Sequence, residues 1–266
     1  ALTRGGLMGA VTERALSARL GLLNAELLAP LLLAASSARR LAITVPGALG
    51  GVPWAMLPGM AGLPFTLATS VSRLLTGRAR ERELPSAIGF AAGPRVPRAG
   101  EEVRRASGAW NGSGAATRIL EAGEATVAAV TDLAASSDVL HIAAHGRHAV
   151  DNPLFSGFEL ADGILFGYDV DLIPRVPATV ILSACELGRS SVRWGEEALG
   201  MTRVWLHAGA DCVIAAPVAV PDDVAAELLS AVHVGLSEGA PPAAALARAT
   251  AETGLSAPFQ CHGDGF

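Results

Sequence analysis

The sequence predicts an α/β fold of three layers, with a mainly parallel central sheet and helices on both of its faces. The first observation behind this prediction is an alternation along the chain. Short apolar runs typical of buried strands are separated by segments in which leucine and alanine recur every three to four residues. The second is that two of the runs break into polar residues and glycine where they end, near His145 and Cys185. Strands that alternate with helices form parallel sheets covered on both faces.

The predicted strands are short runs rich in Val, Ile, Leu and Ala that end in Gly, Pro or polar residues. They are expected at 41–45, 87–91, 118–120, in the stretch from 139, at 158–160 and 164–166, in the stretch from 180, and at 212–215. Residues 161–163 read Ala-Asp-Gly, which indicates a hairpin between the strands that flank them. Helices are expected at 8–38, 67–75, 100–110, 124–135, 196–208, 222–236 and 242–252.

Composition and charge exclude several classes of function. Apolar residues make up 51% of the 266 residues and the net charge is −5, so we expect a globular protein that does not bind nucleic acid. The chain has no lysine, which excludes a lysine Schiff base and the lysine of a phosphate-binding GxxxxGK[ST] loop. Its three cysteines have no paired spacing and do not form a disulfide framework. We therefore expect a cytoplasmic protein.

The longest apolar run, residues 20–38, contains Asn24, Glu26 and Pro30. A membrane span needs about 20 mostly uncharged apolar residues. We therefore interpret the run as a buried helix or helix pair and expect no association with a membrane. Residues 1–266 are expected to form a single domain, in which residues 1–38 are a helical lead-in, the end of an upstream helical region.

A histidine and a cysteine follow two of the predicted strands. His145 comes after the run from Val139, and Cys185 comes after the run from Val180. Parallel strands point their carboxyl ends at the same crevice, so we expect the imidazole and the thiol to lie side by side. An adjacent imidazole raises the thiolate fraction of a cysteine and can then protonate a leaving amine. The pairing predicts a cysteine hydrolase, with Cys185 as the nucleophile and His145 as the base.

Gly146 follows the predicted base directly. Because glycine has no Cβ, its backbone can approach a substrate carbonyl. We expect its N–H and that of Cys185 to form the oxyanion hole.

Several of these residue types also have a purely structural interpretation. A cysteine after an apolar strand is usually a small buried hydrophobe, which is our prediction for Cys212, while Cys261 is expected in a glycine-rich tail without a partner. His141 lies inside its strand and is expected to be a polar core residue held by a hydrogen bond. His148 is expected at the surface or at the rim of the cleft. Cys185 lacks the nearby second cysteine of a structural zinc site, so we expect no metal and no cofactor.

The chain resembles the CHAT domain, a caspase-like cysteine protease module related to separases. The resemblance extends from about Leu41 to the end of the chain, and several ordered blocks carry it. These blocks are 45–57 (VPGALGGVPWAML), 138–146 with its A-x-H-G pattern, 152–156 (NPLFS), 182–186 (LSACE) and 208–223, which begins A-G-A. The resemblance implies a caspase-like fold, with His145 as the base and Cys185 as the nucleophile. It also implies a TPR-like helical-repeat region, attached or on a partner, that regulates the domain.

Four further residues are candidates for the substrate pocket. The family commonly has a tryptophan a few residues after the A-G-A strand, in a segment that borders the cleft, whereas this chain has Val218. Ser183 stands two residues before the predicted nucleophile. Asp222 and Asp223 open a predicted helix after Pro221, where helix N-capping is one explanation and a pocket that selects a basic P1 residue is the other. Asp151 and Glu186 are weaker candidates for the same role.

We therefore expect an intracellular cysteine endopeptidase that acts on a protein or peptide substrate and is regulated by an attached or partner module. The alternative is a caspase-like interaction scaffold whose His-Cys dyad is idle. No third catalytic residue is identifiable from the sequence. The loops after His145 and Cys185 are rich in Gly, Ser and Arg, which predicts that the isolated chain is weakly active or latent. A latent chain would have a dyad wider than a hydrogen bond, or a blocked cleft.

Overall fold

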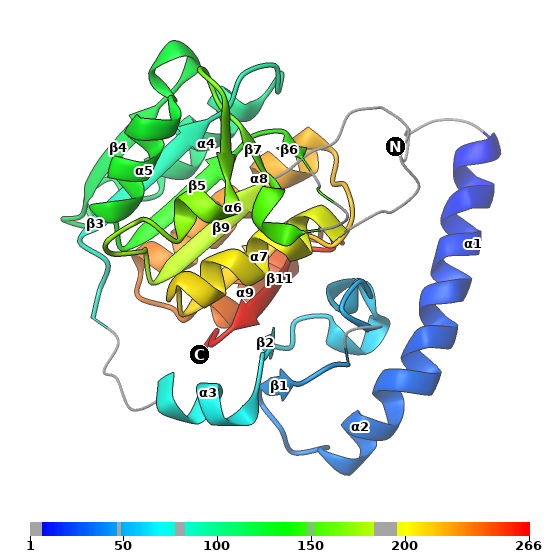
Figure 1. Ribbon diagram of the computed structural model, residues 1–266. Coiled ribbons are helices and arrows are strands. Elements are labelled where there is room, and N and C mark those ends of the chain that lie inside the picture. Colours follow the sequence, from blue (N-terminus) through cyan, green and yellow to red (C-terminus); the bar gives the residue numbers. More distant parts are fainter. Residues whose placement is uncertain (1–6, 47–48, 78–82, 148, 150–151, 184–195) are drawn as a thin grey trace.

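The computed structural model of the protein describes residues 7–46, 49–77, 83–147, 149, 152–183 and 196–266 and has an α/β fold built on an eight-stranded sheet (Figure 1). In spatial order the strands are β1 (Leu41–Ile43), β2 (Phe65–Leu67), β11 (Gln260–Gly263), β10 (Cys212–Ala215), β9 (Thr179–Ser183), β5 (Val139–Ala143), β3 (Ala87–Ala92) and β4 (Ala116–Leu120). The five strands from β10 to β4 run parallel to one another, and β11 is antiparallel to β10 but parallel to β2. The predicted, mainly parallel sheet is confirmed.

A small antiparallel sheet stands beside the carboxyl end of β5. It consists of β6 (Gly146–Arg147), β7 (Gly157–Glu159) and β8 (Ile164–Phe166). The predicted hairpin around residues 161–163 joins β7 to β8. Because β6 follows His145 directly, this sheet fixes the direction in which the chain leaves the central strand.

Helices cover both faces of the central sheet, so the three predicted layers are confirmed (Figure 1). One face carries α4 (Ala99–Gly108), α8 (Asp222–Ser237) and α9 (Pro242–Thr253), and the other carries α5 (Val127–Ala135), α6 (Gly167–Val170) and α7 (Glu196–Ala208). Side chains alternate along each strand between the two faces. In β5, Val139 and Ala143 pack on the α4 and α8 side, and Leu140 and Ile142 pack on the α5 and α7 side.

The N-terminal part of the chain packs as a separate apolar cluster around Trp54 and Leu57. Its elements are α1 (Leu7–Leu23), a π-helical turn (Asn24–Leu28), α2 (Ala29–Ala34), β1, two 3-10 turns (Trp54–Met56 and Pro58–Met60), β2 and α3 (Val71–Gly77). The Asn24 side chain joins the long helix to the second turn, because its Oδ1 accepts a hydrogen bond from Gly59 N (2.8 Å). Two further 3-10 turns, Ala122–Glu124 and Pro153–Phe155, lie later in the chain, next to α5 and β7 in sequence.

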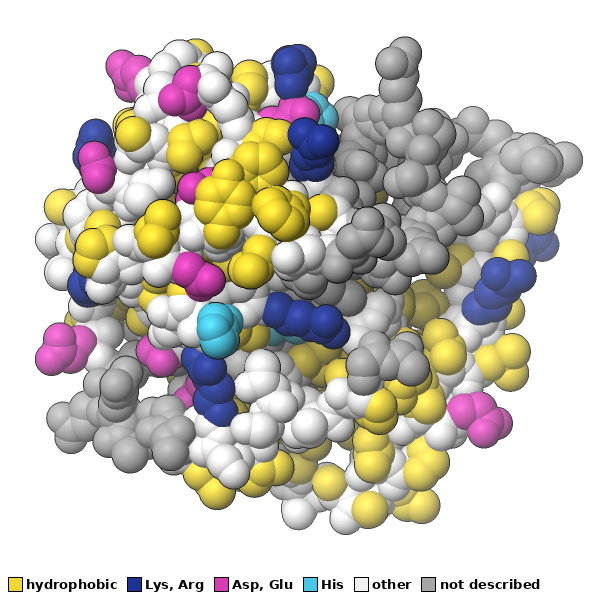
Figure 2. All heavy atoms as spheres, in the orientation of Figure 1, with side chains coloured by type: hydrophobic (Ala, Val, Ile, Leu, Met, Phe, Trp, Pro, Cys, Tyr) yellow, Lys and Arg dark blue, Asp and Glu magenta, His cyan; other side chains and the backbone are white. Residues whose placement is uncertain are grey.

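The prediction of a buried N-terminal helix is wrong for most of its length. Leu20 and Leu28 are buried, but Leu22 is 68% and Leu33 is 81% exposed, because the helix touches the rest of the protein along one stripe only (Figures 1 and 2). Among the described residues, Val11–Ala34 is the one helical stretch long and apolar enough to cross a membrane, judged by length and composition, with a hydropathy of 1.4. The core helix of a soluble protein or a signal sequence can have the same length and apolar composition.

Two further predictions about local structure are wrong. The helix expected at 67–75 is divided into β2 and α3, because residues 65–67 pair with β1 and β11 in the sheet. Cys261 lies in β11 and is fully buried rather than in a tail. The Gln-Cys-His-Gly sequence of this strand has no apolar periodicity, and its pairing with β10 and β2 is a tertiary effect. Cys212 is buried in β10, as predicted.

Candidate functional site

The order of the strands places a crevice at the carboxyl ends of β3 and β5. From β3 the chain crosses through α4 on one face to reach β4, whereas from β5 it crosses through α6 on the other face to reach β9. The loops after these neighbouring strands therefore diverge, as they do at the switch point of a doubly wound sheet, where ligands bind. The loop after β3 begins at Gly93, and the loop after β5 begins at Ala144.

His145 lies in this crevice, half-buried, two residues beyond the end of β5. Its Nε2 is 3.1 Å from the backbone oxygen of Arg95 in the loop after β3. A carbonyl oxygen can only accept a hydrogen bond, so neutral His145 carries its proton on Nε2 and presents Nδ1 as the basic nitrogen. Sequence analysis missed this third group because every residue has a backbone carbonyl, and no residue type signals its role.

The strands that lead to the predicted base and nucleophile are neighbours. Ala143 of β5 pairs with Ser183 of β9, and Ala144 N donates a hydrogen bond to Ser183 O (3.1 Å). From that point the two chains continue to His145 and toward Cys185. The nucleophile itself and the width of the dyad lie outside the described residues.

The residues around Arg95 hold its carbonyl in a fixed place. Arg95 has a φ of +63°, in the left-handed region that is unfavourable for a residue with a Cβ. Its guanidinium forms an ion pair with Glu159 of β7. The backbone N–H of Glu159 in turn donates to the oxygen of His145 (2.9 Å). His145, Arg95 and Glu159 therefore form a closed ring of contacts.

Gly146, the predicted oxyanion-hole residue, is the first residue of β6 and is half-buried. The bond from Glu159 to His145 makes these two residues a hydrogen-bonded pair of the antiparallel ladder. The next pair, Gly146 with Phe158, is then a non-hydrogen-bonded pair. The Gly146 N–H therefore points away from β7.

The candidate pocket residues also lie at the carboxyl edge of the sheet. Ser183 is 2% exposed, and its Oγ has no hydrogen-bond partner among the described residues. The side chain is on the α8 face of β9, the face to which Ile181 contributes. Val218, in the connection from β10 to α8, is half-buried.

Asp222 and Asp223 form the start of α8, as predicted, but neither caps it. The N-cap residue is Pro221 and has no side-chain capping bond. The Oδ1 atom of Asp222 is buried and has no hydrogen-bond partner within the described part of the chain. Both carboxylates act on Arg98, whose pKa is raised chiefly by its hydrogen bond to Glu101 and to a smaller extent by these two charges. Other candidates, His148, Asp151 and Glu186, lie outside the described residues.

His141 is a buried, hydrogen-bonded core residue, as predicted. Trp110 Nε1 is 3.0 Å from His233 Nδ1, His233 Nε2 is 3.1 Å from His141 Nδ1, and His141 Nε2 is 3.0 Å from Glu102 Oε1. Indole N–H can only donate, so the proton of His233 is on Nε2, and it is this proton that His141 Nδ1 accepts. His141 then carries its own proton on Nε2 and donates it to Glu102. Both imidazoles are therefore neutral, and burial together with the neighbouring His141 holds the pKa of His233 well below its usual value.

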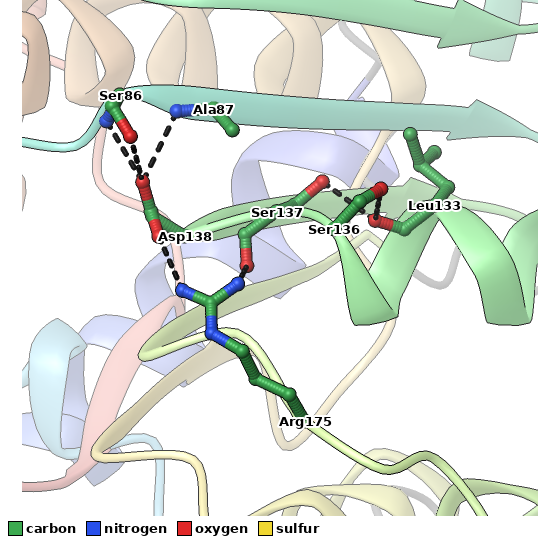
Figure 3. Close-up of polar contacts among 7 residues, drawn as sticks. All are labelled: Ser86, Ala87, Leu133, Ser136, Ser137, Asp138 and Arg175. Atoms are coloured by element: carbon green, nitrogen blue, oxygen red, sulfur yellow. Dashed lines mark hydrogen bonds and ion pairs between the residues drawn. The ribbon is translucent and has the colours of Figure 1, made fainter.

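The opposite, amino edge of the sheet has its own polar cluster, centred on Asp138 (Figure 3). Asp138 Oδ2 accepts hydrogen bonds from Ser86 N (2.8 Å), Ser86 Oγ (2.9 Å) and Ala87 N (3.1 Å), and Oδ1 accepts one from Arg175 (2.5 Å). Burial raises the pKa of Asp138, but these hydrogen bonds outweigh it, and the net shift is downward. A pocket of about 680 Å³, lined in part by Asp138, Asp211 and Asp264, opens beside this cluster. Because Asp138 precedes β5 and His145 follows it, this pocket is separate from the candidate site.

No metal site is built by the residues that the structure describes: no group of three or more His, Cys, Asp or Glu side chains among them is placed to hold an ion. Cys185 and His148 lie outside these residues.

Comparisons with known proteins give one matching family and two similar solved structures. The family model of the CHAT domain matches residues 17–254. The solved structure of the Saccharomyces cerevisiae separase–securin complex is similar to this chain, with a TM-score of 0.60 and 13% identity over 85% of this chain and 15% of that chain. Gingipain R, an arginine-specific cysteine proteinase, is similar over 76% of this chain and 54% of that chain, with a TM-score of 0.48 and 11% identity.

The chain thus spans about 15% of the length of the separase chain. No curated protein matches it in sequence. The likeness to the separase confirms the caspase-like fold that the sequence predicts.

Proposed function

Because the chain belongs to the CHAT domain family, we propose that it is a cysteine endopeptidase with Cys185 as the nucleophile and His145 as the base. The observation that carries the proposal is the register of β5 and β9, in which Ala144 N bonds to Ser183 O (3.1 Å). This pairing sets the end of β9, two residues before Cys185, beside the end of β5, two residues before His145, which supports the proposal that the two side chains share one crevice. A scaffold that only binds a partner has no physical need for this pair of residues.

The proposed reaction follows from the tautomer of His145. Nδ1 accepts the proton of the Cys185 thiol, and the thiolate attacks the carbonyl carbon of the scissile peptide bond. The resulting oxyanion accepts hydrogen bonds from the N–H groups of Gly146 and Cys185. The C–N bond then breaks, Nδ1–H gives its proton to the leaving amine, and an acyl-enzyme thioester remains. Water activated by the same nitrogen hydrolyses the thioester and restores the thiol.

We further propose that the pocket accepts a basic P1 side chain. Ser183 Oγ and Asp222 Oδ1 support this proposal, because buried polar atoms in native proteins normally have hydrogen-bond partners and these have none among the described residues. Each of these atoms can accept a hydrogen bond from a guanidinium or ammonium group of the substrate. Asp223 adds negative charge at the same helix start, and Val218 leaves more room than the tryptophan of the family.

We also propose that a protein module controls the enzyme in the cytoplasm. The solved separase is in a complex with securin, and by analogy a helical-repeat region, attached or on a partner, would hold this chain latent until the site is assembled.

The first test is chemical labelling of the full chain with iodoacetamide. Cys212 and Cys261 are fully buried, so they are internal controls that should not react in the folded protein. The proposal requires that Cys185 be labelled fastest and that His145→Ala slow this labelling. Equal, slow labelling of Cys185 with and without His145→Ala would support the idle scaffold instead.

The second test is cleavage of a peptide library by the full chain, with Cys185→Ala as the inactive control. Cleavage after Arg or Lys that is reduced in Asp222→Asn supports the pocket, whereas cleavage with an unchanged preference for P1 rejects this part of the proposal. Activity that is lost with a chelator and restored by zinc would contradict the metal-free mechanism.

A further inference from the structure

We propose that Glu159 of β7 is a positioning residue for His145 and that it acts through Arg95. The inference rests on the proposed role of His145 as the base. It adds a residue to that site which is neither a member of the His-Cys dyad nor part of the substrate pocket.

The first step concerns the backbone of Arg95. The hydrogen bond to His145 Nε2 (3.1 Å) selects the tautomer in which Nδ1 is basic, and the direction of the Arg95 carbonyl depends on a φ of +63°. A residue with a Cβ rarely adopts this conformation unless its surroundings enforce it. Some contact outside the loop must therefore hold Arg95 in place.

Glu159 supplies contacts of this kind from three sides. Its carboxylate pairs with the Arg95 guanidinium, and its N–H donates to His145 O (2.9 Å). Its carbonyl oxygen lies against the start of the same loop, where a Cβ added to Gly93 would come within 2.6 Å of it. Glu159 thus contacts both the loop that carries Arg95 and the loop that carries His145.

The element that carries Glu159 is itself well anchored. At the turn of the hairpin, Leu160 N donates to Gly163 O (2.7 Å) and Ala161 N donates to Ala125 O (2.9 Å). Asp162 Oδ1 accepts a hydrogen bond from Val127 N at the start of α5 (2.8 Å). The backbone of Glu159 is therefore held firmly, and its carboxylate can hold Arg95 in place.

The ion pair between Arg95 and Glu159 contributes little to the stability of the fold. The Arg95 side chain is 71% exposed and that of Glu159 is 32% exposed, and pairs as exposed as this contribute little to the free energy of unfolding. The ion pair instead favours the positive φ of Arg95 over the negative φ usual for such a residue, and so it sets the direction of the carbonyl that bonds to His145. Loss of the pair should change His145 while leaving the fold as stable as before.

The experiment uses the full chain and reads the tautomer of His145 by ¹⁵N NMR of the imidazole, with the signal assigned by its loss in His145→Gln. In the wild type, neutral His145 should be protonated on Nε2. In Glu159→Ala the share of the Nδ1-protonated form should rise, and kcat/KM should fall roughly tenfold to a hundredfold through kcat, since small misplacements of catalytic groups have effects of this size.

The matched control is Glu238→Ala, which breaks the pair of Glu238 with Arg248 (2.6 Å) at the other end of α8. It removes one exposed carboxylate in the same way but should change neither the tautomer nor kcat. An equal effect of both variants would assign the result to general charge or stability and overturn the proposal.

A second set of variants tests whether Glu159 acts through Arg95. Arg95→Gly keeps the carbonyl and adopts a positive φ without steric cost, so it should retain more of the Nε2-protonated form than Arg95→Ala. Glu159→Ala should have no further effect when combined with Arg95→Ala. Additive effects of the two substitutions would show that Glu159 acts by another route, and would contradict the proposal.

The NMR readout also separates this inference from the peptidase proposal. If the chain cleaves no peptide but Glu159→Ala still shifts the tautomer, the positioning role stands and the proposed reaction fails. If the chain is an active peptidase and the tautomer of His145 is the same in Glu159→Ala, the reaction stands and the positioning role is wrong.

Discussion

His141 and His145 belong to the same stretch of chain, four residues apart, yet their surroundings are opposite in kind. His141 is fully buried within β5, and both of its ring nitrogens bond to buried side chains on α4 and α8. His145 is half-buried beyond the strand, and its Nε2 bonds to a backbone carbonyl in a neighbouring loop. In both, the neutral imidazole carries its proton on Nε2.

The two histidines share one tautomer but differ in the groups that their ring nitrogens contact. In His141, Nδ1 accepts the proton of His233, which has Trp110 as its own donor, and the chain of hydrogen bonds is closed at both ends. In His145, Nε2 bonds to the Arg95 carbonyl, and Nδ1 is the nitrogen that we propose as the base. Packing inside the strand thus accounts for both ring nitrogens of His141, whereas His145, beyond the strand, lies at an edge of the sheet where such folds bind ligands.

The largest expected effect is on activity. His145→Ala should lower kcat/KM for a peptide substrate by roughly 10²- to 10⁴-fold, the range that general bases contribute, because no group remains to activate the thiol. Its free energy of unfolding should change by less than about 1 kcal/mol, since the residue is half-buried at the rim. Peptidase assays and denaturant unfolding of the same preparation measure both quantities. If His145→Ala did not fold, His145 would have a structural role like that of His141, and the proposed difference between the two residues would be wrong.

His141→Ala should have the opposite profile. It leaves Glu102 and His233 buried without their shared partner, and breaking a buried pair of this kind costs about 3–5 kcal/mol. Denaturant unfolding checks the loss. The matched control is the double variant Glu102→Leu with His141→Leu, which removes both polar partners and should regain much of the stability. Equal stability of His141→Ala and the wild type would show that the network contributes nothing.

Stability should fall as the pH drops from 6.5 to about 5. His233 and His262 are buried and neutral; their pKa values are lowered by burial, for His262 to about 4. The unfolded chain binds protons at these histidines below about pH 6.5 and the folded chain does not, so each one removes up to about 1.4 kcal/mol per pH unit. Urea unfolding at several pH values measures the slope.

The pH dependence has a matched pair of variants. His262→Gln should flatten the slope, and His207→Gln, at an exposed position, should leave it unchanged. A slope that is the same in all three proteins would show that His262 is not one of its sources.

Trp110→Phe should have the smallest effect, about 1 kcal/mol of stability, the size of one hydrogen bond. An aromatic six-membered ring is kept, but the pyrrole ring is lost together with its N–H, the donor to His233 Nδ1 (3.0 Å). Glu102 still accepts at the other end of the chain of hydrogen bonds, so ¹⁵N NMR should show His233 still protonated on Nε2. A second tautomer of His233 would mean that Trp110, and not Glu102, fixes the direction of the chain.

The sequence by itself determined the elements with a local cause. The strand from Val139 and the helix of α7 were predicted almost residue by residue, because periodicity and breaking residues act over a few positions. The same local pattern placed His145 and Ser183 at strand ends, and it identified His141 as a core residue. The family resemblance gave the catalytic roles, which stay predictions.

Only the tertiary structure decided the features that depend on partners distant in the chain. Phe65–Leu67 and Gln260–Gly263 are strands because each finds a neighbour in the sheet, and α1 and α2 are exposed because only one stripe of them finds a partner. The carbonyl of Arg95 became a site group for the same reason. Backbone atoms are alike in every residue, and only folding determines which of them meets His145.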